Sequence, residues 1–266
     1  MESIRFRLLG EVRVSPAHIG ADRLIQSTMA RALLVVLLTD GLNGVVPAHR
    51  MVDALWDDPP RSACSNLRTY KTRLQRELER LCLPDRITVG ARGTGGYGVR
   101  AEPDEVDVIV FRSLVATARQ RVQEGRPDLG AKLFADALAL WRGRPGDDLP
   151  TTRRLTALTD LLSIERMDAV EGFSRAAVLS GRYQAAISIL ERTLPEQPTR
   201  ESTWVLLACA HFASGNAALA QSAIRRACEA LAHGVGLDPG KDLRAAERAA
   251  ILHDADWFER YLLTTE

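Results

Sequence analysis

The residues with the clearest chemical potential lie between Ser62 and Leu81. Drawn as a helix, this segment has an apolar stripe at three- and four-residue steps, made of Leu67, Tyr70, Leu74, Leu78 and Leu81. The exposed side carries arginines and hydroxyls, at Ser65, Arg68, Thr69, Thr72, Arg73 and Arg76. Arginine can bind O6 and N7 of guanine with two hydrogen bonds, and hydroxyls bond to bases or phosphates. The face therefore predicts DNA recognition in the major groove.

The elements around this helix are those that a DNA-reading helix needs. A helix over residues 47–56 precedes it, separated by the Pro-Pro break at 59–60, and strands over 87–89 and 97–99 follow. Helix, turn, basic helix and hairpin are the order of a winged helix-turn-helix. A plain solvated surface helix is the alternative for the basic face alone, and the flanking turn and hairpin favour DNA binding.

Further DNA contacts are predicted outside the groove-facing helix. In the hairpin, or wing, the candidates are Arg92, Thr94 and Tyr97. For phosphate, the candidates are His49, Arg50 and Ser62. Ser62 stands at the expected N-cap, where a helix directs its positive end toward an anion.

Charge is unevenly distributed along the chain. Residues 1–100 carry 15 Lys and Arg against 10 Asp and Glu, and residues 61–100 alone carry 9 against 3. The remaining residues carry 20 against 24. A basic region beside an acidic one fits a DNA-binding domain joined to a domain that faces proteins. For the first hundred residues alone, chance fluctuation remains the alternative.

The sequence offers no basis for catalysis, so we predict a protein that is not an enzyme and has no metal or cofactor. The five histidines are scattered without metal-binding spacing, and no GxSxG elbow occurs. The glycine-rich segment 93–98 leads into strand-like residues rather than a helix, which favours a hairpin over a phosphate loop. No apolar run suits a membrane span and the first residues lack a signal core, so we expect a cytoplasmic location.

The predicted fold is an α+β winged helix-turn-helix domain over residues 1–102, followed by an all-α domain over 103–253 and a tail over 254–266. The first domain is expected to enclose its own core. In the second, the expected helices span 107–124, 128–142, 152–180, 182–194, 199–213, 216–233 and 241–253. Ser180-Gly181 and Ser214-Gly215 are 34 residues apart, the tetratricopeptide period, and Gly125 marks an earlier copy. A generic helical bundle is the alternative.

Short motifs along residues 3–250 resemble those of the Streptomyces antibiotic regulatory proteins, in their small two-domain form. The N-terminal motifs are Phe6–Gly10, Arg31–Leu34, Leu55-Trp56, Leu67–Leu74 and Gly96-Tyr97. The C-terminal motifs are Val106-Asp107 with Phe111, Ala137–Gly143, Gln197–Glu201, Ser214-Gly215 and Gly236–Arg244. The chain departs from the family pattern in the loop Arg144–Asp148 and at Gly98, where a bulkier wing residue is common.

The resemblance implies an OmpR-type winged helix joined to a bacterial transcriptional activation domain with tetratricopeptide-like helices. It also implies a function: pathway-specific activation of antibiotic or other secondary-metabolite gene clusters. Such proteins bind direct repeats of double-stranded DNA near a promoter, as a homodimer on the DNA, and recruit RNA polymerase including its sigma factor. Two alternatives stay open, a helical-repeat adaptor that binds protein instead of DNA, and a repressor with the same DNA contacts.

Overall fold

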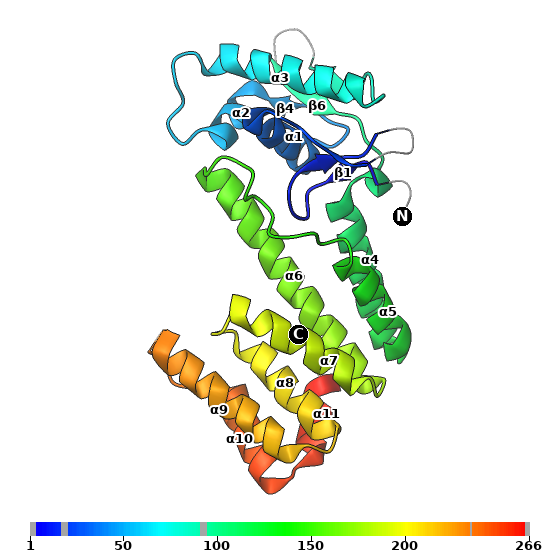
Figure 1. Ribbon diagram of the computed structural model, residues 1–266, viewed down its shortest axis with the longest axis vertical. Coiled ribbons are helices and arrows are strands. Elements are labelled where there is room, and N and C mark those ends of the chain that lie inside the picture. Colours follow the sequence, from blue (N-terminus) through cyan, green and yellow to red (C-terminus); the bar gives the residue numbers. More distant parts are fainter. Residues whose placement is uncertain (1–3, 17–20, 91–94, 235, 264–266) are drawn as a thin grey trace. The chain divides into compact units, whose positions relative to one another are not determined.

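The computed structural model describes residues 4–16, 21–90, 95–234 and 236–263, and it divides into two compact units. Unit 1 contains residues 1–113 and 139–165, and unit 2 contains residues 114–138 and 166–266. Helices α4 (Asp107–Gln123) and α6 (Arg153–Leu179) contribute residues to both units. The predicted fold class is confirmed, because a small region with strands is followed by helices (Figure 1).

Unit 1 has the predicted winged-helix order. Its first antiparallel sheet consists of β1 (Phe6–Arg7), β2 (Arg13–Val14) and β3 (Arg23–Leu24). The helices that follow are α1 (Thr28–Asp40), α2 (Ala48–Leu55) and α3 (Ala63–Arg80). A second antiparallel sheet has the order β4 (Val46–Pro47), β6 (Gly96–Val99) and β5 (Ile87–Val89). The short helix η1 (Pro103–Glu105) leads into α4.

Helix α1 is the centre of unit 1. It begins after the N-cap Ser27, whose side chain accepts a hydrogen bond from the backbone N–H of Ala30 at 3.4 Å. Residues 30–38 are all buried, and α1 packs against α2, α3 and β6. A helix that is apolar on every side belongs inside a core. Arg31 is the one charged residue of this buried stretch.

The Arg31 guanidinium is paired with Asp148, far along the chain. Its Nε lies 3.0 Å from Asp148 Oδ2, and the two side chains are 8% and 9% exposed. Its other nitrogens donate to the carbonyls of Ile25 and Asp148 and to the Thr28 hydroxyl. Asp148 Oδ2 also accepts from the backbone N–H of Val12 at 3.0 Å. One buried pair therefore joins α1, the first sheet and the loop before α6.

Asp107 forms a second connection of this kind. Its fully buried carboxylate accepts hydrogen bonds from the backbone N–H groups of Leu8 and Leu9, at 2.8 to 3.0 Å.

The Thr152 hydroxyl donates to the carbonyl of Ala54 at 2.7 Å, which anchors the start of α6 on the end of α2. The core of unit 1 thus includes residues beyond position 102.

Helix α5 (Pro127–Leu138) ends four residues before the predicted end at 142. Beyond it, the backbone N–H of Arg142 donates to the Leu9 carbonyl at 2.9 Å. The Trp141 ring packs edge-on against Phe111, with centroids 5.5 Å apart. These contacts draw residues 139–142 into unit 1 and away from a helical path.

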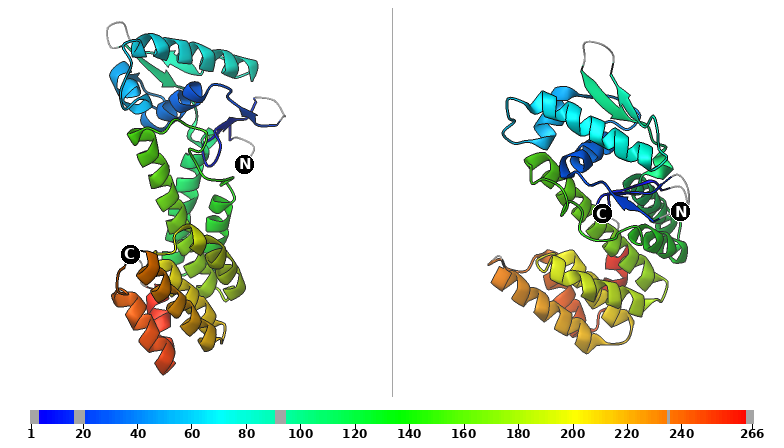
Figure 2. Two further views of the ribbon diagram at one scale, coloured as in Figure 1. Left: turned by 60° about the vertical axis from the view of Figure 1, so that its left-hand side comes forward. Right: turned by 45° about the horizontal axis from the view of Figure 1, so that its top comes forward.

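Unit 2 is a series of antiparallel helix pairs, visible in both panels of Figure 2. After α6 come α7 (Tyr183–Thr193), η2 (Leu194–Glu196), α8 (Glu201–Ala213), α9 (Ala217–Gly234), α10 (Lys241–Leu252) and α11 (Ala255–Leu263). Most of the stretch predicted as a tail is thus the helix α11. Among the described residues, no helix is both long and apolar enough to cross a membrane.

The turns of unit 2 confirm the predicted repeat. Gly125, Gly181 and Gly215 all have positive φ, at 73°, 75° and 83°. The residue after each glycine donates its N–H to the carbonyl five residues earlier, at 2.9, 2.7 and 2.9 Å. This is the Schellman pattern, which favours glycine because a side chain is strained at positive φ. One turn geometry therefore recurs at these three glycines, as expected of tetratricopeptide-like helix pairs.

The first prediction concerns the buried pair. Replacing Asp148 with Ala leaves the Arg31 charge buried without its partner, and we expect a loss of about 3–5 kcal/mol in the free energy of unfolding. Urea denaturation followed by circular dichroism measures it. Asp147→Ala is the matched control, because Asp147 is exposed and its ion pair with Arg144 spans 3.9 Å. Equal effects of the two substitutions would contradict a central role for Asp148.

The second prediction concerns pH. Burial raises the pKa of Asp107 from its ordinary 3.8 to about 6. The folded state thus binds this proton more tightly than the unfolded state, so the contribution to stability is complete below pH 3.8 and is lost as the pH rises through 6. We expect wild type to gain stability relative to Asp107→Asn when the pH falls from 7 to 4.5, measured by urea denaturation. A constant difference between the two proteins would show that the Asp107 pKa is unperturbed.

Candidate nucleic-acid interface

Helix α3 is fixed by its apolar stripe. Leu67, Leu74 and Leu78 are buried, and α3 packs on α1 and α2. The Trp56 ring lies against Tyr70 with centroids 6.0 Å apart, which ties the turn after α2 to α3. The predicted stripe is confirmed in these positions, and it directs the opposite side of α3 toward solvent.

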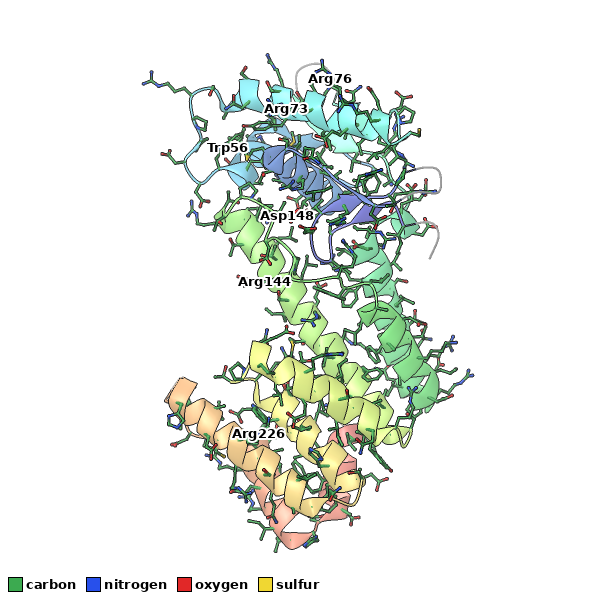
Figure 3. All side chains as sticks on the ribbon, in the orientation of Figure 1. Trp56, Arg73, Arg76, Arg144, Asp148 and Arg226 are labelled. Carbon is green, nitrogen blue, oxygen red and sulfur yellow. The ribbon has the colours of Figure 1, made fainter. Side chains whose placement is uncertain are left out.

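That opposite side carries the predicted DNA-contacting residues together. All six are exposed on one face of α3, namely Ser65, Arg68, Thr69, Thr72, Arg73 and Arg76. Figure 3 labels Arg73 and Arg76 on this helix. Within the part of the chain that the structure describes, the guanidinium groups of these arginines form no ion pair or hydrogen bond. The arginines have their donors available for a ligand.

Several arginines elsewhere in unit 1 are paired with carboxylates instead. Arg7, Arg86 and Arg154 each contact a carboxylate, at 2.8, 2.6 and 2.8 Å. On α3 itself, Glu77 is used structurally, since its carboxylate accepts from the backbone N–H of Gln26 at 3.0 Å. The concentration of unpaired arginines on one face thus distinguishes α3 within its unit.

The hydroxyls on this face are more restricted than the sequence suggests. Thr69 and Thr72 donate to the carbonyls of Ser65 and Arg68, at 3.2 and 2.9 Å. Their oxygens therefore remain as acceptors, suited to a base amino group rather than a phosphate oxygen. Ser62 is at the N-cap, but its side chain makes no capping hydrogen bond and instead accepts from Asn66 Nδ2 at 3.2 Å. Capping by the Ser62 hydroxyl is thus not observed.

His49 and Arg50 are exposed in the first turn of α2. The preceding residue, Ala48, donates its backbone N–H to the Gly95 carbonyl at 2.7 Å, so the start of α2 adjoins the base of the wing. Both side chains remain candidates for a phosphate at this place, as the sequence predicts.

The wing strands β5 and β6 form the predicted hairpin, and Figure 2 shows them beside α3. Tyr97 lies within the sheet, opposite Val89 on one side and Val46 on the other, and it is half-buried. Arg92 and Thr94 lie outside the described residues. Gly98 departs from the family pattern for a steric reason, because a Cβ there would meet the Gly44 carbonyl oxygen at 1.9 Å.

Two further arginines at the ends of α3 were not among the predicted contacts, although the helical spacing puts Arg80 beside the basic face. Arg61 precedes the α3 N-cap and Arg80 ends the helix, and both are exposed. Neither guanidinium has an ion-pair partner among the residues described. The available signals were the helical spacing from Arg76 to Arg80 and the position of Arg61 directly after Pro-Pro.

Comparison with known proteins now identifies the family. The model of the bacterial transcriptional activator domain matches residues 106–252. The chain belongs to the Streptomyces antibiotic regulatory protein family. The regulatory protein DnrI of Streptomyces peucetius is 25% identical over 79% of this chain and 79% of its own length. The transcriptional regulator RedD of Streptomyces coelicolor is 27% identical over 94% of this chain and 71% of its own.

The similarity extends to a mycobacterial regulator whose structure is known. EmbR of Mycobacterium tuberculosis is 27% identical over 90% of this chain, which spans 61% of the length of EmbR. The structure of EmbR in complex with a low-affinity phosphopeptide superposes with a TM-score of 0.86 at 26% identity. That superposition covers 98% of this chain and 68% of the EmbR chain. The fold of both units is therefore shared with EmbR.

The arginine face can be tested with one substitution. Removing a bidentate base contact costs about 1–3 kcal/mol of discrimination. We expect Arg73→Ala to weaken binding to the cognate site by about tenfold or more, with little change on random DNA, in fluorescence anisotropy titrations. Arg225→Ala is the matched control, an exposed arginine of α9. Equal losses on cognate and random DNA would mean that Arg73 does not read bases.

Proposed function

We propose that this protein is a sequence-specific DNA-binding transcriptional activator for a secondary-metabolite gene cluster, acting in the cytoplasm. The observation that carries the proposal is the exposed α3 face with the unpaired Arg68, Arg73 and Arg76, set in a winged-helix unit. The relatives DnrI and RedD, named as regulators, support the same function. Binding as a homodimer to direct repeats, which the family resemblance implies, is part of this proposal.

The helical unit supplies the activating part of the proposal. Residues 114–138 and 166–266 of unit 2 carry 15 Lys and Arg against 16 Asp and Glu, a nearly neutral balance that gives no general attraction to phosphates. Stacked helix pairs build surfaces that bind protein segments. RNA polymerase with its sigma factor, which is present at every promoter, is the partner that we propose.

Salt dependence separates DNA binding from the adaptor alternative. Each phosphate that the protein neutralises releases counterions, so the logarithm of the binding constant falls with the logarithm of salt at a slope of about −0.9 per phosphate. A steep slope on promoter DNA supports the proposal, and a flat slope favours an adaptor whose winged helix binds protein.

Polymerase recruitment separates an activator from a repressor. We expect the full-length protein at saturation to raise the affinity of polymerase for one promoter fragment by about 5–150-fold, the usual range of coupling between two sites. Pairwise titrations on that fragment measure it. The Arg73→Ala protein, used at a concentration at which wild type saturates the DNA, should raise polymerase affinity less, because the variant occupies only part of the DNA sites. Unchanged or lower polymerase affinity would overturn the activator and favour the repressor.

A further inference from the structure

One face of the helical repeat is covered by the last helix of the chain. In a series of helix pairs, α6, α8 and α10 share one side, while α7 and α9 lie on the other. Helix α11 packs against α8 and α10. Its Phe258 ring stacks on Phe212 of α8, with centroids 4.3 Å apart. Its Tyr261 lies under the guanidinium of Arg175 from α6, 5.3 Å from the ring centroid, so α11 touches all three helices of that side.

Contact with this face is what gives α11 its structure. The helix has nine residues, too few to be stable alone in water. Its buried residues are Phe258 and Leu262, four positions apart on one stripe, whereas Ala255, Asp256 and Glu259 are exposed. The Tyr261 carbonyl at its C-terminal end accepts a hydrogen bond from Arg175 Nη1. Two apolar side chains, the Tyr261 ring beneath Arg175 and one terminal carbonyl therefore define the docking.

The face is complete before α11 is added. The match to the bacterial transcriptional activator domain ends at residue 252, and α10 ends there too. His253, with φ of 55°, turns the chain so that α11 begins two residues later. Burial raises the pKa of Tyr261, and charged or titratable groups on three helices also act on it: Glu171 and Arg175 of α6, Cys209 of α8 and Asp242 of α10. The tyrosine ring thus occupies the place where these helices meet.

Helical repeats use their shared inner faces to bind segments of other proteins, and a groove of this kind accepts an amphipathic helix. We propose that α11 is a ligand held in cis on the face of α6, α8 and α10. When α11 leaves, the face binds a partner protein through an amphipathic helix of the same chemistry. That helix carries an aromatic residue and a large aliphatic residue four positions apart, and its last carbonyls face Arg175. The short connection after α10 keeps the local concentration of α11 high, so the partner must compete with it.

Hydrogen exchange on the intact chain tests whether α11 opens independently. If it is a displaceable ligand, the amides of residues 259–263 exchange at least tenfold faster than the bonded amides of α8, because local opening is less costly than unfolding of the unit. Phe258→Ala should accelerate exchange in α11 further while α8 stays protected. Exchange of α11 and α8 at one common rate would overturn the proposal, since the helix would then be an inseparable part of the fold.

Binding in trans tests the face itself. The probe is a fluorescent peptide with the sequence of residues 254–266, titrated into full-length proteins. We expect Phe258→Ala protein, whose own α11 is weakened, to bind the peptide at least tenfold more tightly than wild type. Glu259→Ala protein, altered at an exposed position of α11, should match wild type, and a peptide carrying Phe258→Ala should bind at least tenfold more weakly. Equal affinity of all three proteins, or no difference between the peptides, would overturn the proposal.

Discussion

The buried pair of Arg31 and Asp148 is the interaction on which unit 1 depends most. A guanidinium inside an apolar helix is tolerable only when its charge and its donors are satisfied, and here a carboxylate, two carbonyls and a hydroxyl satisfy them. Because the partners are Ile25 directly after β3, Thr28 of α1 and Asp148 in the loop before α6, the pair fixes α1 within the unit. Helix α3 packs on α1, so the direction of its arginine face follows from this arrangement.

The elements of this unit could be predicted from the sequence where the signal is local. The stripe of Leu67, Leu74 and Leu78, the cap at Ser27 and the hairpin strands each lie within one short window. The pairing of Arg31 with Asp148 and of Leu8 with Asp107 could not be predicted, because these partners are 117 and 99 positions away and no periodicity links them. The same limit explains why residues 139–142 were expected to be helical and why α11 was expected to be a tail. In the candidate site, the residues on the exposed face of α3 could be predicted from helical spacing. The hydrogen bonds of its threonine hydroxyls could not, because they depend on the side-chain rotamers.

Motifs that the family resemblance singles out acquire physical reasons in unit 2. Arg200, from the motif Gln197–Glu201, holds α6 through Glu171 and Asp168, at 2.7 and 2.6 Å. The next residue, Glu201, accepts from the backbone N–H of Gly240, the N-cap of α10, at 2.8 Å. The motifs Gln197–Glu201 and Gly236–Arg244 therefore contact each other through this hydrogen bond. Gly172 is explained by packing, since a Cβ there would lie 2.5 Å from the Phe134 ring. That close approach offsets the roughly 1 kcal/mol that glycine costs inside a helix.

Repulsion between the arginines on the face of α3 destabilises this helix, and contacts elsewhere in unit 1 must offset that loss. Arg73 and Arg76, and again Arg76 and Arg80, are spaced so that like charges adjoin on the helix surface, which destabilises it by roughly 0.2–0.5 kcal/mol per pair. No carboxylate among the described residues neutralises these side chains. The buried leucines of α3 and the Asp148 anchor of α1 act on a larger scale, about 2–5 kcal/mol for each group removed. Unit 1 therefore holds an unneutralised cationic face in place without depending on it, and a phosphate backbone is the polyanion that would relieve the repulsion.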